Sequence, residues 1–256
     1  MFMEEKDLGE LLLTRNDKKI YANKDVITKV FSHKAYSSSD VLKEAMNQEY
    51  AIELGFHAPA VLDVFPVGKD WAISSKKIEG DTLKELMDKD PENKKKYVQK
   101  LVQIQIEILS HLTSNLKLPK LKDKLNNYIN ESGLDATTRY DLQTRLEKMP
   151  NHYKFCHGDI CPENIILHGD SYYVLDWAHA TRGNAAADAA MTYLLFVLSG
   201  DEKAADMYVK EFCKKSNTAL SYVQEWISVV SATKLRSVKD PAKREILTRN
   251  ISVVEY

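Results

Sequence analysis

The most informative part of this chain is the stretch FCHGDICPENIILHGDSYYVLDWAHATRGNAAADAAMTYLL, residues 155–195. Within it, IIL at 165–167 and YYVL at 172–175 flank a polar turn, a pattern typical of an antiparallel hairpin. Asp159 and Asn164 precede this hairpin on a proline-containing loop, and Asp176 follows it. Because a hairpin returns the chain to its start, we expect Asp176 to lie beside Asn164.

Two carboxylates and one carboxamide would converge in that arrangement. Such hard oxygen donors suit Mg²⁺, and they leave coordination positions for phosphate oxygens and water. Any one of these residues could simply occupy a turn, where Asp and Asn are common. The combination of Asp159, Asn164 and Asp176 around one hairpin favours a metal-assisted phosphate site instead.

In the rest of the chain, the predicted secondary structure changes from mainly strands to mainly helices at about Gly80. Before it, strand-like runs predominate, with one helix predicted from an N-cap at Ser39 over Asp40 to Leu54 and ended by Gly55. The predicted strands are KKIYA (18–22), DVITKVF (25–31), VLDVFPV (61–67) and WAISS (71–75). After it, apolar residues recur at helical spacing, which predicts helices over 92–112, 121–131, 135–148 and from about 185 to the C-terminus.

The overall composition is that of an ordinary globular protein. The 256 residues include 36 Lys and Arg against 37 Asp and Glu, a balance that disfavours bulk electrostatic binding to nucleic acid. The apolar run from Ala189 to Leu198 is too short to cross a bilayer. Acidic residues at 4, 5 and 7 precede the apolar run at 11–13, unlike a secretory leader, and three cysteines fit reduced thiols. We expect a cytoplasmic protein that binds neither nucleic acid nor membrane; the composition leaves its oligomeric state undefined.

The motif His157-Gly158-Asp159, then Pro162 and Asn164, then LDW at 175–177, resembles the catalytic segment of the aminoglycoside phosphotransferase and choline kinase-like family. The resemblance implies an α+β, bilobal protein-kinase-like fold. Residues 1–80 would form a small antiparallel-sheet N-lobe that binds nucleotide, with a hinge at about 75–80. Residues 81–256 would form a larger, mainly helical C-lobe with the catalytic loop and the acceptor site.

The same resemblance assigns roles to individual residues. Asp159 would be the catalytic base, or the group that orients the acceptor hydroxyl. Asn164 and Asp176 would hold Mg²⁺ on the phosphates of ATP, with GTP as an alternative co-substrate. His157 and Asp188 would support the catalytic loop. Phosphoryl transfer asks a protein mainly for such positioning and charge neutralisation.

A kinase-like fold also needs a strand lysine on the nucleotide phosphates, paired with a helix glutamate. Lys29 lies in the apolar strand VITKVF, where an unpaired ammonium would be costly. On a helical wheel Glu49 falls in the middle of the apolar face of the predicted helix, whereas Glu44 points roughly the opposite way. We therefore expect a Lys29–Glu49 ion pair in the ATP site.

The segment after the last small-lobe strand aligns with the hinge of the family. It comprises Ser75, Lys76, Lys77 and Ile78, whose backbone would bind the adenine edge. An ordinary linker between lobes would look the same in sequence.

One departure from the family pattern lies between the first two strands, where the phosphates are usually covered by a glycine-bearing turn. That region reads LGELLLTRNDKKIYA (8–22), with Gly9 early and a polar TRND at 14–17 in the expected turn. This keeps a nucleotide-binding pseudokinase regulator open as an alternative, and an atypical protein kinase is a second one.

The acceptor is expected to be a small molecule with a hydroxyl group. Residues 82–150 hold 13 basic and 10 acidic side chains, and residues 201–256 hold 10 and 8. A site for polycationic aminoglycosides should be lined with carboxylates, so this balance weakly disfavours them. Aromatic residues for a choline cage are present, and a neutral or anionic metabolite stays open.

Overall fold

The computed structural model describes residues 5–15, 17–113, 116–169 and 171–252. The chain divides into two compact units. The first comprises Met1–Glu85 with Glu163–His179, and the second comprises Leu86–Pro162 with Ala180–Tyr256. This division differs from a boundary at about residue 80, because the hairpin around residues 165–174 bonds to elements of the first unit.

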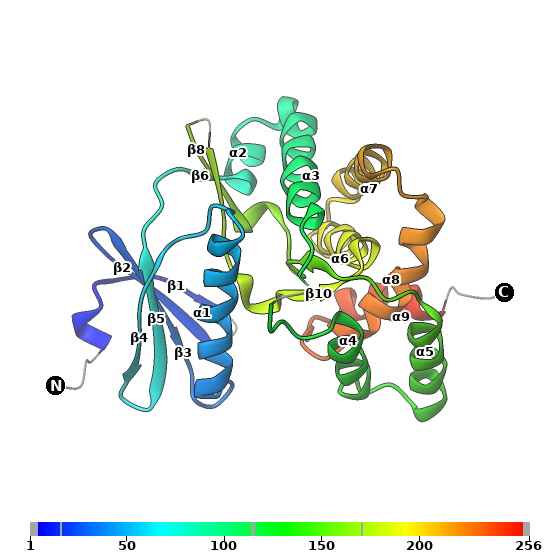
Figure 1. The fold of residues 1–256 in the computed structure, drawn as a ribbon, viewed down its shortest axis with the longest axis horizontal. Helices are drawn as coiled ribbons and strands as arrows, with labels where there is room; N and C mark the ends of the chain where they lie inside the picture. Colours follow the sequence, from blue (N-terminus) through cyan, green and yellow to red (C-terminus); the bar gives the residue numbers. More distant parts are fainter. Residues whose placement is uncertain (1–4, 16, 114–115, 170, 253–256) are drawn as a thin grey trace. The chain divides into compact units, whose positions relative to one another are not determined.

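The first unit is built on a five-stranded antiparallel sheet in the order β1-β2-β3-β5-β4 (Figure 1). The predicted strands are all present, and β1 is added at the edge. Their bounds are β1 Glu10–Arg15, β2 Lys18–Asn23, β3 Val26–Phe31, β4 Val61–Val67 and β5 Asp70–Lys76.

The turn between β1 and β2 is shorter than predicted, because Thr14 and Arg15 belong to β1. Asn16 lies outside the described residues. Asp17 has a φ of 60°, a left-handed conformation that glycine usually takes and that Asp tolerates better than most residues. The polar turn therefore provides, without glycine, one backbone conformation that a glycine turn would supply.

Helix α1, Ser38–Glu53, covers one face of this sheet (Figure 1). It packs with Phe31 and Ile73 in one apolar cluster, while Tyr21, Val30 and Ala72 pack on the opposite face of the sheet. The helix begins two residues earlier than predicted. Ser37 rather than Ser39 is the N-cap, because Ser37 and Asp40 satisfy each other's backbone amides in a capping box.

The predicted hairpin forms β8, Ile165–His168, and β9, Ser171–Val174, and β8 also pairs with the short β6, Asp81–Thr82. Contacts on both strands tie the hairpin to the rest of the first unit. The Val174 amide donates to the His57 carbonyl at 2.8 Å, and His168 Nδ1 lies 2.7 Å from the Glu79 carbonyl oxygen. Gly80, at φ 139°, packs against the Leu167 carbonyl, where a Cβ would clash.

The second unit is mainly helical, as predicted, and contains a two-stranded sheet of β7, Lys154–Cys156, and β10, Thr181–Gly183. Its helices follow the predicted periodicity within a few residues. They are α3 Lys94–Ser110, α4 Leu121–Asn130, α5 Ala136–Lys148, α6 Ala185–Leu198, α7 Glu202–Ser216, α8 Leu220–Leu235 and α9 Pro241–Ser252, preceded by α2 Leu83–Lys89 at the boundary between units. None of the helices in the described ranges combines the length and apolar character needed to cross a membrane.

Candidate active site

Lys29 of β3 is held between two carboxylates in the first unit. Its Nζ lies 2.6 Å from Glu44 Oε1 and 3.3 Å from Asp176 Oδ1. Burial alone would lower the pKa of Lys29, but the charges of Glu44 and Asp176 outweigh it and raise the pKa above its usual value. Lys29 therefore keeps its positive charge at neutral pH.

The predicted pairing of Lys29 with Glu49 is wrong. Glu49 is exposed, and its Oε1 accepts a hydrogen bond from the Val61 amide at 3.3 Å. The helical wheel misplaced the buried face because it treated Leu42 and Met46 as core residues. Both are exposed, at 51% and 39%.

The buried face of α1 instead carries polar side chains whose hydrogen bonds are satisfied. Asn47 donates to the Trp177 carbonyl at 3.0 Å, and Gln48 donates to the Pro59 carbonyl. Glu44, on the same face, accepts from Lys29 and also lies 3.2 Å from Lys18 Nζ. Lys18 was missed in the sequence; the signal was its position opposite Phe31 in the β2–β3 register, which puts it on the Lys29 face.

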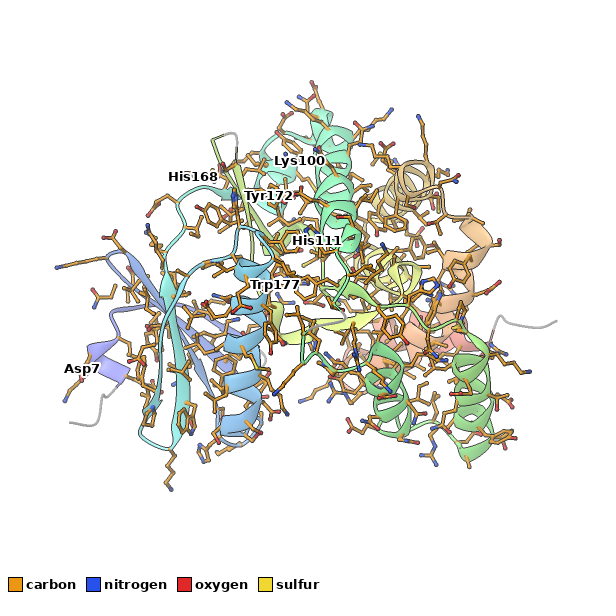
Figure 2. All side chains as sticks on the ribbon, in the orientation of Figure 1. Asp7, Lys100, His111, His168, Tyr172 and Trp177 are labelled. Atoms are coloured by element: carbon orange, nitrogen blue, oxygen red, sulfur yellow. The ribbon has the colours of Figure 1, made fainter. Side chains whose placement is uncertain are left out.

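Asp176 lies beside Asn164, as the hairpin predicted. The Leu175 amide donates to the Asn164 carbonyl at 2.8 Å, one pair beyond the Ile165–Val174 register. Asp176 has a φ of 62°, a left-handed conformation that only a few residue types tolerate. Trp177 after it is fully buried, stacks on Phe56 and lies beside α1 (Figure 2), which fixes the backbone at this point.

The chemistry of Asn164 and Asp176 fits Mg²⁺, because both offer hard oxygen donors. Among the described residues, no three His, Cys, Asp or Glu side chains gather closely enough to hold a metal by themselves. A magnesium ion on this pair would take its other ligands from phosphate oxygens and water, as is usual for nucleotide sites.

Asp159 lies in the second unit, on a loop that follows β7 and is held by buried groups. The Asp159 amide donates to Nδ1 of the fully buried His157 at 3.2 Å. The Gly158 amide donates to Asp188 Oδ1 at 2.6 Å, and Gln105 Nε2 donates to Asp188 Oδ2 at 2.9 Å. Burial raises the pKa of Asp188, while these donors act in the opposite direction. His157 and Asp188 thus have the contacts expected of residues that support the loop.

The side chain of Asp159 points to a partner that sequence reasoning missed. Lys234 Nζ, from the last turn of α8, lies 3.2 Å from Asp159 Oδ1, and both side chains are 21% exposed. The two residues are 75 positions apart, and no periodicity in α8 distinguishes Lys234 from its other polar residues.

The predicted hinge begins where β5 ends. The Lys76 amide donates to the Ala60 carbonyl at 3.0 Å, and the Lys77 amide donates to the Asp25 carbonyl at 2.7 Å. Ser75 pairs with Ile27 and Val61 in the sheet. Of the amides in this predicted hinge, those of Lys76 and Lys77 are therefore committed to the sheet.

Several solved structures share this fold. Aminoglycoside phosphotransferase APH(4)-Ia matches with a TM-score of 0.69 at 14% identity, over 94% of this chain and 90% of that one. An amicoumacin kinase in complex with AMP-PNP and Ca²⁺ matches with a TM-score of 0.68 at 12% identity, over 98% and 88%. The aminoglycoside-3'-phosphotransferase of type VIII matches with a TM-score of 0.64 at 13% identity, over 86% and 93%. The likeness establishes a kinase-like fold.

The sequence comparison defines the family. No curated protein matches the chain. The profile of the phosphotransferase enzyme family matches residues 20–226, which is most of the chain. The chain therefore belongs to the phosphotransferase enzyme family and is a phosphotransferase of the kinase class, and the resemblance found in the HGD and LDW motifs is confirmed.

Proposed function

We propose that this protein transfers the γ-phosphoryl group of ATP to a hydroxyl group of a small molecule. The observation that carries the proposal is the ammonium group of Lys29, held charged between Glu44 and Asp176. A strand lysine paired with a helix glutamate is the arrangement by which kinase-like enzymes hold nucleotide phosphates.

Each residue then has a defined task at the nucleotide. Lys29 binds phosphate oxygens, and Glu44 keeps the lysine in place. Asn164 and Asp176 hold Mg²⁺, which, when bound, would neutralise charge on the phosphates. Adenine recognition by a hinge amide falls to Ile78, since the amides of Lys76 and Lys77 bond within the sheet. Ser75 would face the purine.

Asp159 acts on the acceptor. Its carboxylate accepts the proton of the hydroxyl group as that oxygen attacks the γ-phosphorus, and ADP leaves. The amides of Gly158 and Asp159 donate hydrogen bonds to Asp188 and His157. These bonds fix the loop on which Asp159 lies, so the carboxylate is positioned before the acceptor binds. The antibiotics bound in the similar structures are ligands of those proteins.

The test is ADP release from Mg-ATP in the presence of a mixed acceptor panel of aminoglycosides, choline, sugars, sugar phosphates and hydroxy acids. We expect one class to stimulate release, and Asp159→Asn to lower that rate by about 10²–10⁴-fold, the usual contribution of a general base. Asp123→Asn, at an exposed position of the same unit, is the matched control.

Equal turnover by Asp159→Asn and the wild type would overturn the role of Asp159. Label transferred from ATP to protein instead of metabolite would favour the atypical protein kinase. Mg-ATP binding without phosphoryl transfer to any metabolite or protein would favour the nucleotide-binding pseudokinase regulator.

A further inference from the structure

Three cationic side chains gather near Asp159 in the second unit. Lys234 forms the ion pair with Asp159 described above. Arg236 follows directly after α8, and its guanidinium carbon lies 4.0 Å from the centroid of the Tyr128 ring. Lys124, one turn before Tyr128 on α4, places its Nζ 5.8 Å from the same centroid. Two helices thus bring Lys124, Lys234 and Arg236, here called the basic cluster, to one place.

The positive charges of the basic cluster repel one another. Burial and the charges of Arg236 and Lys234 lower the pKa of Lys124 to about 8, and the charge of Asp159 opposes them. Arg236 is also 3.3 Å from Oε2 of the exposed Glu131. An anion bound among these side chains would reduce the repulsion between them.

The same side chains stay within reach of a ligand. The side chains of Lys234 and Asp159 are each 21% exposed and that of Arg236 is 37% exposed. An oxyanion placed here would be bound by charge-assisted hydrogen bonds, which are stronger than neutral ones, and arginine in particular can bind a carboxylate or phosphate with two parallel bonds. A polycation would be repelled by the same charges.

We propose that the basic cluster binds an oxyanion group, a carboxylate or a phosphate, of the acceptor whose hydroxyl group is phosphorylated. The inference rests on the proposed function, in which Asp159 receives the proton of that hydroxyl. It names the acceptor class as an anionic hydroxylated metabolite, such as a sugar phosphate or a hydroxy acid, and it separates this chain from kinases of polycationic aminoglycosides.

The test is calorimetric titration of the full chain with matched probes. D-ribose 5-phosphate and D-glycerate carry the two kinds of oxyanion, D-ribose and glycerol are their neutral partners, and kanamycin is the polycation. We expect at least one anion to bind about tenfold or more tightly than its neutral partner, which is the strength of one charge-assisted hydrogen bond, and kanamycin to bind no better than the neutral probes.

Variants assign that binding to the cluster. Lys124→Met and Arg236→Gln should each weaken anion binding about tenfold, while Lys124→Arg should retain it, which guards against loss of the fold. Lys148→Met, at an exposed position on α5, is the matched control and should bind like the wild type. Tighter binding of kanamycin or of the neutral probes, an absence of anion binding, or equal affinities in Lys124→Met and the wild type would each overturn the proposal.

Failure of the proposed function gives a different result. Asp159→Asn should lose phosphoryl transfer yet bind the anion at least as tightly, because a repelling carboxylate is removed. Anion binding that depends on Lys124, in a protein that never consumes ATP, would refute the phosphotransfer proposal and leave the oxyanion site standing.

Discussion

Glu44 balances two ammonium groups, those of Lys18 and Lys29, while only 6% of its side chain is exposed. Removing a buried carboxylate of this kind is costly mainly because the cations that it paired with are left without a counter-charge. Without it, two cations would face each other near Phe31 and Tyr36, whose rings Lys18 already contacts at 4.9 and 5.2 Å. The position of Lys29 in the proposed ATP site therefore depends on Glu44.

The first prediction concerns this residue. Glu44→Gln should lower the free energy of unfolding by about 3 kcal/mol, the usual cost of breaking a buried ion pair, and weaken Mg-ATP binding at least tenfold. Glu49→Gln, on the same helix but exposed, should change stability by less than about 0.5 kcal/mol. Urea unfolding and nucleotide titration measure both effects. A larger loss of nucleotide affinity in Glu49→Gln than in Glu44→Gln would favour Glu49 as the partner of Lys29, as the helical wheel predicted.

The second prediction concerns how the affinity for an anion depends on pH through the charge of Lys124. Because its pKa is lowered to about 8 by burial and by Arg236 and Lys234, against the opposing charge of Asp159, it loses its proton as the pH rises through that value. Ribose 5-phosphate is dianionic throughout this range, since its second pKa is about 6. Its affinity for the wild type should therefore fall several-fold between pH 7 and 9.5.

Lys124→Arg provides the control for that titration, because the guanidinium stays charged up to at least pH 12. Its affinity should stay nearly level over the same range. The other charged side chains around this position, those of Arg236, Lys234, Asp159 and Glu131, are the same in both proteins. A wild-type affinity that is independent of pH would show that the charge of Lys124 takes no part in anion binding.

At the scale of elements, the loop 157–159 depends on backbone conformation as well as on side chains. Gly158 has a φ of 81°, and its amide donates to Asp188 at the first turn of α6. A residue with a Cβ is strained in that conformation by about 1–2 kcal/mol, and relief of the strain would turn the amide away from Asp188. The neighbouring Asp159 would move with it.

Gly158→Ala should therefore lower the transfer rate at least tenfold while leaving Mg-ATP affinity nearly unchanged, as measured by steady-state kinetics and nucleotide titration. Gly133→Ala is its matched control. Gly133 has a similar φ of 77° in the same unit, and a Cβ there would meet nothing. Both variants should lose about 1 kcal/mol of stability. If Gly133→Ala slowed transfer equally, the effect would be one of stability and not of the loop.

The elements that could be predicted from the sequence are those whose pattern is local. Alternating and β-branched runs located the strands, and the turn HGDS at 168–171 located the hairpin that brings Asp176 to Asn164. The presence of helix α1 was predicted correctly, but its buried face was not. Glu44, Asn47 and Gln48 lie on that face, where they form an ion pair or hydrogen bonds with residues distant in the sequence. A helical wheel that considers only apolar residues cannot indicate such long-range partners.

The basic cluster escaped prediction for a related reason. Lys124, Lys234 and Arg236 come from α4 and the end of α8, and a charged residue on an amphipathic helix is most often a solvated one. Only tertiary packing brings them near Asp159. The only indication in the sequence was the excess of basic over acidic residues in segments 82–150 and 201–256, and this excess does not show which residues form a site.

At the scale of the whole molecule, the proposed tasks divide between the two units. Lys29, Glu44, Asn164 and Asp176 all belong to the first, and Asp159 belongs to the second with Lys234. If the nucleotide is bound by the first group alone, nucleotide binding and phosphoryl transfer should be separable by single substitutions, one in each unit.

The last prediction uses thermal unfolding of the full chain with and without Mg-ATP. A ligand at a hundred times its Kd stabilises by about 2.7 kcal/mol, or roughly 5–10 °C for a chain of this size. Asp159→Asn should keep this shift, whereas Asp176→Asn should lose its magnesium-dependent part. Asparagine is the right substitution at Asp176, because it tolerates the left-handed conformation there and removes only the charge. Asp123→Asn should behave like the wild type. An unchanged magnesium-dependent shift in Asp176→Asn would place the metal elsewhere, and a lost shift in Asp159→Asn would mean that the second unit also binds the nucleotide.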